Sequence, residues 1–250
     1  MVSYAANAFA EDLKPTSQIL LIDYGNTNLD LLELYLLRAG YKVSRASDGT
    51  NDHRLYHQYQ PDLILLELEP HSRGLGLLRR LRTQFHLTIP IIVVSANNRE
   101  EDKVQGLEEG ADDYITRPFS IAELLMRIKV ALRRGQEQAR YSDRSFSNSY
   151  QEVRTPDGLY ISKTRHRVEL NGTEVELRPK EFELLWFLAT HPGRVFSREQ
   201  VLEEVWNYAG FGDLSTITVH MRRLREKVEI DPMQPRHLKT VWGLGYKFEP

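Results

Sequence analysis

Glu67 follows a short apolar run in this 250-residue chain, at a place where a carboxylate can do chemistry. The run, residues 63–66, has four consecutive apolar side chains and suits a strand that is buried on both faces of a parallel sheet. Ligands of open α/β sheets bind just outside the carboxyl ends of their strands. The sequence therefore predicts that Glu67 lies at a ligand-binding edge.

The elements that must position Glu67 alternate between strands and helices over the first half of the chain. Strands are expected at residues 19–22, 41–46, 63–66, 89–94 and 114–116, and a helical pattern follows each of them. Alternation of this kind is typical of right-handed βαβ units. We expect an α/β domain in which helices cover both faces of a doubly wound, five-stranded parallel sheet.

Composition narrows the class of protein. The absence of cysteine excludes disulfides and thiolate metal sites and fits a reducing cytosol. The first 18 residues make a poor signal peptide, and no apolar run reaches the ~18 residues of a membrane span. We expect a cytoplasmic protein without a membrane partner. The net charge is −2 and neither half is basic in bulk, so any nucleic-acid surface must come from local clustering.

The chain divides into four segments: a flexible tail (1–17), the first domain (18–135), a linker rich in Ser, Gln and Arg (136–152) and a second domain (153–250). In the second domain, short β runs precede three helical patterns and a closing hairpin, which predicts an α+β fold. Asn171-Gly172 is a strong hairpin turn signal. Ser197, with Gln200 three residues later, predicts the start of the second helix.

The third helical pattern of the second domain has two different sides. Ile217, Met221, Leu224 and Val228 recur at helical spacing and form an apolar stripe. Between residues 222 and 227, four basic residues stand against one acidic residue. A helix with one side in the core and a basic side outward suits the major groove of DNA. The same period also fits a charged helix surface in solvent.

The motifs ILLID, PDLILLE, IPIIVVSA and GADDYITRPFS resemble the receiver domain of bacterial response regulators over residues 18–134. The resemblance implies a flavodoxin-like fold, an aspartate after the third strand that a histidine kinase phosphorylates, and two acids that hold Mg²⁺. It places Asp23 and Tyr24 at the positions of the two acids and Glu67 at the phosphoacceptor position. Ser95 takes the position of the Thr or Ser that ends the fourth strand, and Arg117 that of the lysine before the proline after the fifth.

Three of these five positions differ from the family pattern, and the loop over residues 68–74 is one residue shorter. Losing one acid and lengthening another spoils the ligand count and geometry that Mg²⁺ needs, so we expect weak or absent Mg²⁺ binding and no cofactor. A guanidinium matches a carboxylate, so Glu67 and Arg117 would form an ionic clamp to which Ser95 also donates. The alternatives are an inactive pocket held together by packing, and residual phosphorylation.

The same resemblance implies a switch residue and a dimer. Tyr114 takes the position of the aromatic switch, which packs inward when Ser95 is engaged; the alternative is an ordinary strand tyrosine. The family dimerises through a face that here carries charged residues, and a two-fold contact needs such self-complementarity. We expect Lys103 to pair with Glu123, and Asp113 with Arg127, across the two-fold, with Asp112 on the same face; the alternative is solvated surface charge.

The motifs RPKEFELLWFLATHPGRVFSREQVLEEVW, TITVHMRRLREKVE and KTVWGLGYKF resemble the winged-helix effector domain of the OmpR/PhoB subfamily over residues 153–248. The resemblance implies base contacts from Thr218, Val219 and Arg223. It implies contacts with the DNA backbone from the residues Arg198, Trp206, Arg222, Arg225, Thr240 and Tyr246. Trp242 stands where the family has a wing arginine, so it either stacks on sugars or packs on the wing.

These resemblances predict a transcriptional regulator rather than an enzyme. We expect a homodimer that binds double-stranded DNA at tandem half-sites about one helical turn apart, with RNA polymerase as a further partner. Its receiver would act without phosphorylation. The alternatives are a phosphorylation-switched regulator with an unorthodox acceptor, and a receiver that senses a ligand or a partner protein.

Overall fold

The computed structural model describes residues 17–23, 30–46, 56, 58–68, 74–141, 151–206 and 213–250. In the helix over residues 121–141, the side chains are described only as far as residue 132. The chain splits into two compact units, Met1–Gly135 and Gln136–Pro250, and each is described by itself. The expected tail lies almost entirely outside the described residues. No helix in the described part is long and apolar enough to cross a membrane.

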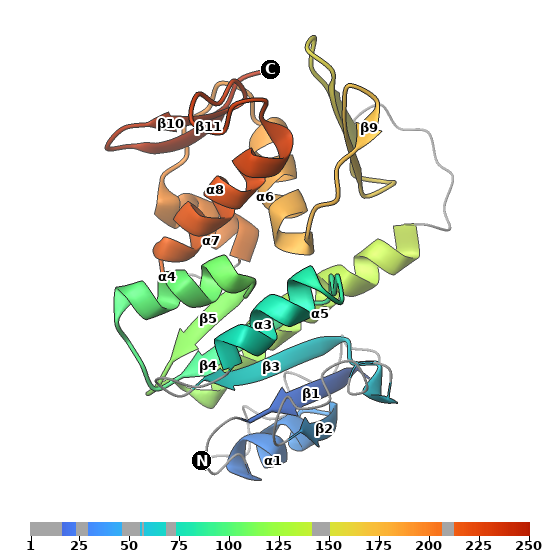
Figure 1. Ribbon diagram of the computed structural model, residues 1–250, viewed down its shortest axis with the longest axis vertical. Coiled ribbons are helices and arrows are strands. Elements are labelled where there is room, and N and C mark those ends of the chain that lie inside the picture. The colour runs from blue at the N-terminus through green and yellow to red at the C-terminus, as the bar shows by residue number, and fades with distance from the viewer. Residues whose placement is uncertain are drawn as a thin grey trace, which may run out of the picture. The chain divides into compact units, whose positions relative to one another are not determined.

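The first unit is a parallel sheet with helices on both faces (Figure 1). Its strand order is β2-β1-β3-β4-β5, and every pairing is parallel. The strands are β1 (Gln18–Ile22), β2 (Lys42–Ala46), β3 (Leu63–Leu68), β4 (Ile91–Ser95) and β5 (Asp113–Thr116). The helices are α1 (Asp30–Arg38), α3 (Gly74–Thr83), α4 (Glu100–Glu109) and α5 (Ile121–Tyr141). The predicted flavodoxin-like receiver fold is confirmed.

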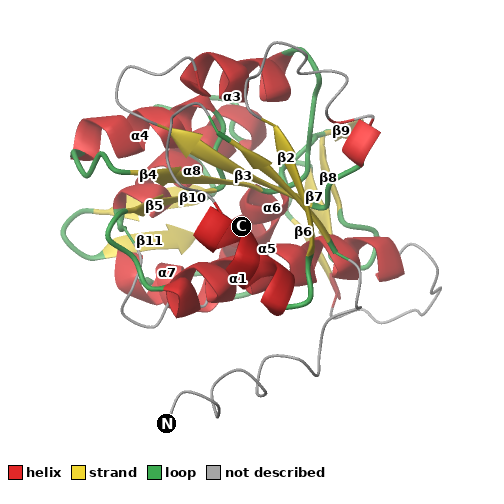
Figure 2. Cartoon of the chain, turned by 90° about the horizontal axis from the view of Figure 1, so that it is seen from below, coloured by secondary structure: helices red, strands yellow, loops and turns green. Residues whose placement is uncertain are grey.

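Burial on both faces explains why the central strands β3 and β4 lack polar alternation. All six residues of β3 are buried. On one face, Leu65 belongs to a core with Leu36 of α1 and Ile128 of α5. Figure 2 shows α3 on the other side of the sheet from α1. A strand covered on both faces reads as a continuous apolar run.

The second unit contains an antiparallel sheet, three helices and a closing hairpin. The sheet runs β6 (Glu152–Arg154), β7 (Leu159–Ser162), β8 (Arg167–Leu170) and β9 (Thr173–Glu174). The helices α6 (Pro179–Ala189), α7 (Arg198–Trp206) and α8 (Ser215–Val228) follow. Strands β10 (Leu238–Val241) and β11 (Gly245–Phe248) form the hairpin, called the wing below. The winged-helix domain is confirmed.

Local sequence signals account for several boundaries. Asn171 and Gly172 have φ of 53° and 79°, the positive values that a tight hairpin turn requires. Ser197 Oγ accepts a hydrogen bond from the Gln200 N–H at 3.2 Å, and Gln200 Oε1 accepts one from the Ser197 N–H at 2.9 Å. This reciprocal cap begins α7 as predicted. The linker differs from the expectation, because α5 continues to Tyr141 and β6 already begins at Glu152.

The predicted two-sided character of α8 is also confirmed on its apolar side. Ile217, Met221, Leu224 and Val228 all lie in the core of the second unit, where α8 packs against α6. Burial of one such stripe holds the helix in place. Its remaining surface is therefore available to carry function.

Candidate functional site

The carboxyl ends of β1, β3, β4 and β5 bring the predicted pocket residues to one edge of the parallel sheet. The register pairs the residue after Glu67 with Ser95, and Ser95 with Thr116. Asp23 follows the last residue of β1, and Arg117 follows the last residue of β5. Four of the five predicted pocket residues therefore converge at this edge. Tyr24 and most of the loop after β3 lie outside the described residues.

An ion pair joins two of these residues. Arg117 Nη2 lies 2.6 Å from Glu67 Oε1, and the exposed fractions of the two side chains are 30% and 5%. The pair connects the ends of β3 and β5, which are separated by β4 in the sheet. A charge-assisted hydrogen bond of this length is among the stronger polar contacts in proteins. The carboxylate of Glu67 is thus bound to a cation from the same chain.

Ser95 lies buried beside Tyr114, the predicted switch residue. Burial raises the pKa of Tyr114, although interaction of its hydroxyl with the Ser95 side chain opposes the shift. Its ring lies close to α4, because a Cβ added at Gly106 would be 2.8 Å from Tyr114 Cε2. The Asn97 N–H also donates to Ser95 Oγ at 3.1 Å. Tyr114 therefore has the inward position, in contact with the pocket hydroxyl.

Asp112 was expected at a dimer contact, and the structure gives it a different role. Its carboxylate lies 2.5 Å from Arg82 Nη2 of α3, and both side chains are buried. Asp112 also accepts from the Ile91 N–H at 2.8 Å, while Arg82 donates to the main-chain oxygens of Leu87, Ile89 and Gly110. The predicted partner contact of Asp112 stays a prediction, and within the single chain its carboxylate is buried and already paired. The pair instead ties α3 to the starts of β4 and β5.

The other charges of this face pair within the chain. Arg127 Nη1 lies 2.9 Å from Asp113 Oδ2, and Arg127 Nη2 lies 2.7 Å from Glu123 Oε1. Asp113 and Arg127 are thus partners within the chain, and their expected pairing across a two-fold stays a prediction. Lys103 of α4 is half-buried. These contacts orient the side chains of α5 before any second copy binds.

The outward side of α8 holds the predicted base-reading residues. Thr218 and Arg222 are exposed, and Arg222 Nε lies 3.2 Å from Glu226 one turn later. Arg223 is half-buried. Val219 is buried, with an exposed fraction of 5%. Of the three predicted base contacts, Thr218 is the one that the structure fully presents to solvent.

Trp206 was expected to touch the DNA backbone, and this prediction is wrong for its side chain. Trp206 is 0% exposed and is one of the largest fully buried side chains. Its ring packs edge-on against His220 of α8, with centroids 5.1 Å apart, and Lys180 Nζ lies 5.0 Å from its centroid. The helical period gave the signal, because Trp206 follows buried Leu202 by four residues. Trp206 is a core residue that joins α7 to α8.

Arg225 was expected near phosphates, but it holds the wing. Its guanidinium donates to the main-chain oxygen of Leu238 at 2.6 and 2.9 Å and to Thr240 Oγ1 at 2.7 Å. Burial lowers the pKa of Arg225, although Tyr246 and Glu229 oppose this shift. The residue therefore fixes β10 against α8, with part of its surface at the groove described next.

A groove of about 480 Å³ lies between the start of α7, α8 and the wing. Six of the predicted DNA-binding residues line it: Arg198, Thr218, Arg225, Thr240, Trp242 and Tyr246. These residues come from three elements that are distant in sequence, and the fold brings them together. The groove is open to a ligand that runs along the surface.

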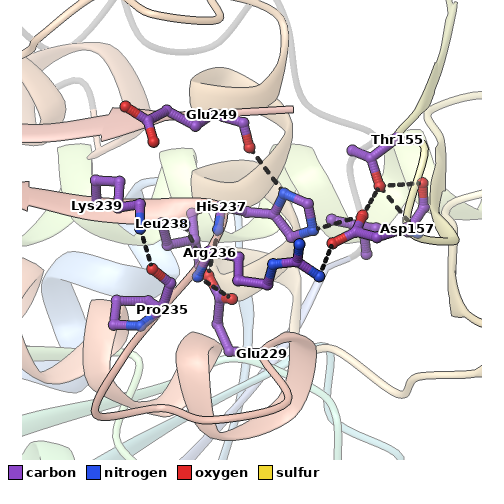
Figure 3. Close-up of polar contacts among 10 residues, drawn as sticks. Thr155, Asp157, Glu229, Pro235, Arg236, His237, Leu238, Lys239 and Glu249 are labelled. Carbon is purple, nitrogen blue, oxygen red and sulfur yellow. Dashed lines mark hydrogen bonds and ion pairs between the residues drawn. The ribbon is translucent and has the colours of Figure 1, made fainter.

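A polar cluster before the wing escaped the sequence analysis (Figure 3). His237 Nε2 lies 3.0 Å from Asp157 Oδ1, and His237 Nδ1 lies 2.7 Å from the main-chain oxygen of Glu249. Burial acts to raise the pKa of Asp157, but the Thr155 hydroxyl and the charge of His237 lower it overall. The Glu229 carboxylate accepts hydrogen bonds from the main-chain N–H groups of residues 236–238. A lone histidine in the segment between α8 and β10 has no periodicity, so no pattern could identify this cluster.

The ion pair between the buried Glu181 and Lys227 makes the stability of the second unit depend on pH. Burial acts to raise the pKa of Glu181, but Lys227 Nζ at 2.7 Å and the Arg178 N–H hold it below its usual value. A carboxyl whose folded pKa is lowered stabilises the fold above its unfolded pKa of about 4.3, and this contribution is lost as the pH falls through the folded pKa.

We therefore expect the wild-type chain to lose stability below about pH 4 more steeply than Glu181→Gln. All three tryptophans, Trp186, Trp206 and Trp242, lie in the second unit, so their fluorescence reports its urea midpoint at each pH. Equal slopes for the two proteins between pH 5 and pH 3 would contradict the assignment.

Comparison with known proteins gives a consistent result for both units. A family model described as "Response regulator receiver domain" matches residues 19–129, and one described as "Transcriptional regulatory protein, C terminal" matches residues 172–248. The transcriptional regulatory protein ResD of Bacillus subtilis (strain 168) is 40% identical over 235 residues, which are 93% of this chain and 96% of ResD.

Two further similarities agree with this. The transcriptional regulatory protein SrrA of Staphylococcus aureus (strain NCTC 8325 / PS 47) is 39% identical over 236 residues, or 94% of this chain and 96% of SrrA. A solved structure of a RitR mutant superposes with a TM-score of 0.66 at 26% identity, over 93% of this chain and 99% of that one. These similarities extend through both units and the segment between them.

Proposed function

The chain belongs to the OmpR/PhoB-type response regulators, which are DNA-binding transcriptional regulators of two-component systems, and we propose that its receiver works without phosphorylation. The observation that carries this proposal is the Glu67–Arg117 ion pair. Glu67 stands where the family's motif has its phosphoacceptor aspartate. An acceptor carboxylate must be available to attack a phosphoryl group, and here a guanidinium of the same chain holds it.

The pair offers a permanent substitute for a phosphate contact. A phosphoryl group on an aspartate brings negative charge toward the cation at the end of β5. The Glu67 side chain is one methylene longer than aspartate, and its carboxylate already reaches Arg117 at 2.6 Å. A guanidinium forms a planar, directional contact with a carboxylate, which suits a lasting pair better than a lysine ammonium does. We infer that the strand ends are held in one arrangement by this contact.

The pocket residues do not fit Mg²⁺. This ion needs near-octahedral oxygen ligands, usually including one or two available carboxylates. Of the pocket carboxylates in the described part, Asp23 lies at the end of β1, where the family pattern has two acids, and Glu67 is engaged by a cation. In the described residues, no group of three or more His, Cys, Asp or Glu side chains could hold a metal ion. We infer weak or absent Mg²⁺ binding, and no step of the proposed function depends on the metal.

We further infer that the chain acts as a homodimer in the cytoplasm. The support comes from α5, where Met126 is exposed close to the charged pair of Glu123 and Arg127. An apolar centre with charged surroundings suits a two-fold contact, since each copy presents both parts. Lys103 of α4 remains a candidate to pair with Glu123 of a second copy.

The groove between α7, α8 and the wing is the surface that we assign to duplex DNA. Thr218 on α8 would face base edges, and Arg198 at the start of α7 would meet a phosphate. A helix N-terminus also favours phosphate through its free N–H groups. Two chains in a dimer would occupy tandem half-sites, and their outer surface would be available to RNA polymerase.

The ion pair is tested by Glu67→Ala in the full chain, with the DNA probe selected from random-sequence duplexes by the wild-type protein. We expect the dissociation constant to rise about tenfold or more, since a hydrogen bond to a charged group contributes about 1.5–3 kcal/mol. Arg99→Ala is the matched control, because it removes an exposed arginine that pairs locally with Asp102. Unchanged DNA affinity and unchanged dimerisation in Glu67→Ala would refute the clamp.

A further inference from the structure

Two exposed apolar side chains lie at the tip of the wing. Trp242 is 91% exposed and Leu244 is 65% exposed, and Gly243 separates them. Single exposed hydrophobic residues are common on protein surfaces. Here the two lie on one turn, and Trp242 also lines the groove assigned to DNA. The alternative that Trp242 packs on the wing does not fit this exposure.

The base of the wing is fixed, which gives the tip a defined position. The main chains of Phe196 and Tyr246 exchange two hydrogen bonds, each of 2.9 Å. Gly245 approaches this segment so closely that a Cβ there would lie 1.9 Å from the Phe196 oxygen. The tip itself is a turn closed by the Leu244 N–H and the Val241 oxygen at 2.9 Å. Trp242 is thus carried on a rigid support rather than on a loose loop.

The surroundings of Trp242 select the kind of ligand that can cover it. The groove beside the tip contains the exposed Arg198 and part of Arg225, together with Thr218, against one acidic lining residue, Glu199. A ligand that fills it must offer negative charge to the arginines and an apolar surface to the indole. Duplex DNA has both, because phosphates flank the apolar faces of the deoxyriboses. Charge complementarity therefore identifies duplex DNA as the ligand that we expect to cover the tip of the wing.

We propose that Trp242, supported by Leu244, packs against deoxyribose and the minor-groove edge of the operator. The wing would then sense the shape of the groove by apolar contact and not by a cation. This inference rests on the proposed binding of DNA in the adjacent groove. An arginine would instead neutralise phosphate and favour narrow, A-tract grooves, where the negative potential is strongest.

An apolar contact by Trp242 and a cationic contact by an arginine differ in how the DNA affinity depends on salt concentration. Each phosphate that a cation neutralises adds about 0.9 to the slope of log affinity against log salt concentration. An apolar contact with sugar and base edges releases no counterion. Trp242→Ala should therefore weaken binding at every salt concentration without changing the slope, whereas Trp242→Arg should make the slope steeper by about 0.9.

The test uses full-length chains and a fluorescently labelled duplex selected from random-sequence DNA by the wild-type protein, prepared with one half-site and with two. On one half-site we expect Trp242→Ala to bind about tenfold more weakly, within the range for aromatic contacts with nucleic acid, and Trp242→Phe to recover most of the affinity. Unchanged binding of Trp242→Ala would overturn the proposal. A loss confined to the two-site duplex would also overturn it, since the tip would then contact a neighbouring protein copy.

Arg198→Ala separates this proposal from the assignment of the groove. We expect weaker binding with a slope shallower by about 0.9, because one phosphate contact is lost. If Arg198→Ala behaves so and Trp242→Ala binds normally, the tip inference fails and the groove assignment stands. If both variants bind normally, the groove is not the DNA surface, and both fail.

Discussion

Arg82→Met is expected to destabilise the receiver unit by about 3–5 kcal/mol, which is the usual cost of removing one partner from a buried ion pair. The substitution keeps the length of the side chain but leaves the Asp112 carboxylate buried without its cation. It also removes the donor to the main-chain oxygens of Leu87, Ile89 and Gly110. Three segments that position β4 and β5 would lose their common contact.

Hydrogen exchange followed by mass spectrometry can localise this loss. We expect faster exchange in peptides from β4 and β5 and little change in the second unit. Arg79→Ala is the matched control, because Arg79 on the same helix pairs with Glu109 of α4 at the exposed surface, where solvent screens the pair. If peptides from β4 and β5 exchange equally slowly in Arg82→Met and in Arg79→Ala, the buried pair does not have the structural role described here.

Gly245→Ala is expected to disrupt the wing. The added Cβ would lie 1.9 Å from the Phe196 oxygen, and φ at this residue is 144°, a value that side chains rarely adopt. The base of the hairpin would have to move away from the Phe196 segment. We expect a loss of roughly 3 kcal/mol or more, since backbone strain adds to the loss of two hydrogen bonds. DNA affinity should fall as well, because the wing forms one wall of the groove.

Gly243→Ala provides the comparison for that substitution. Gly243 also has a positive φ, of 75°, but its added Cβ would have no atom within 4 Å. We expect only the strain of the left-handed conformation, about 1–2 kcal/mol. Urea unfolding followed by tryptophan fluorescence measures both variants. Equal destabilisation would show that strain alone, and not the contact with Phe196, determines the effect of Gly245→Ala.

The sequence predicted those features that come from short, regular patterns. Continuous apolar runs located β1, β3 and β4 of the parallel sheet, and the residues that follow strands β1 and β5 and the run 63–66 gave Asp23, Arg117 and Glu67. The apolar stripe of α8 was likewise readable from its period. The register then brought the residues after the strands to one edge, which follows from parallel pairing.

The features that the sequence missed depend on tertiary contacts between unrelated patterns. Arg82 sits at the end of an amphipathic helix, where a basic residue usually points to solvent, and its partner Asp112 is 30 residues away. His237 and Asp157 meet only when the last strands return to the first sheet of the second unit. Trp206 was assigned by resemblance, although its spacing from Leu202 already indicated the core.

The claim that this receiver acts without phosphorylation is tested most directly by intact mass spectrometry of the full chain after incubation with a small phosphodonor and Mg²⁺. We expect the mass to remain that of the unmodified chain, because Arg117 holds Glu67 and the pocket does not fit the metal. A kinase-responsive receiver treated in parallel confirms that the donor is active. The addition of one phosphoryl group to Glu67 or Asp23 would contradict the account.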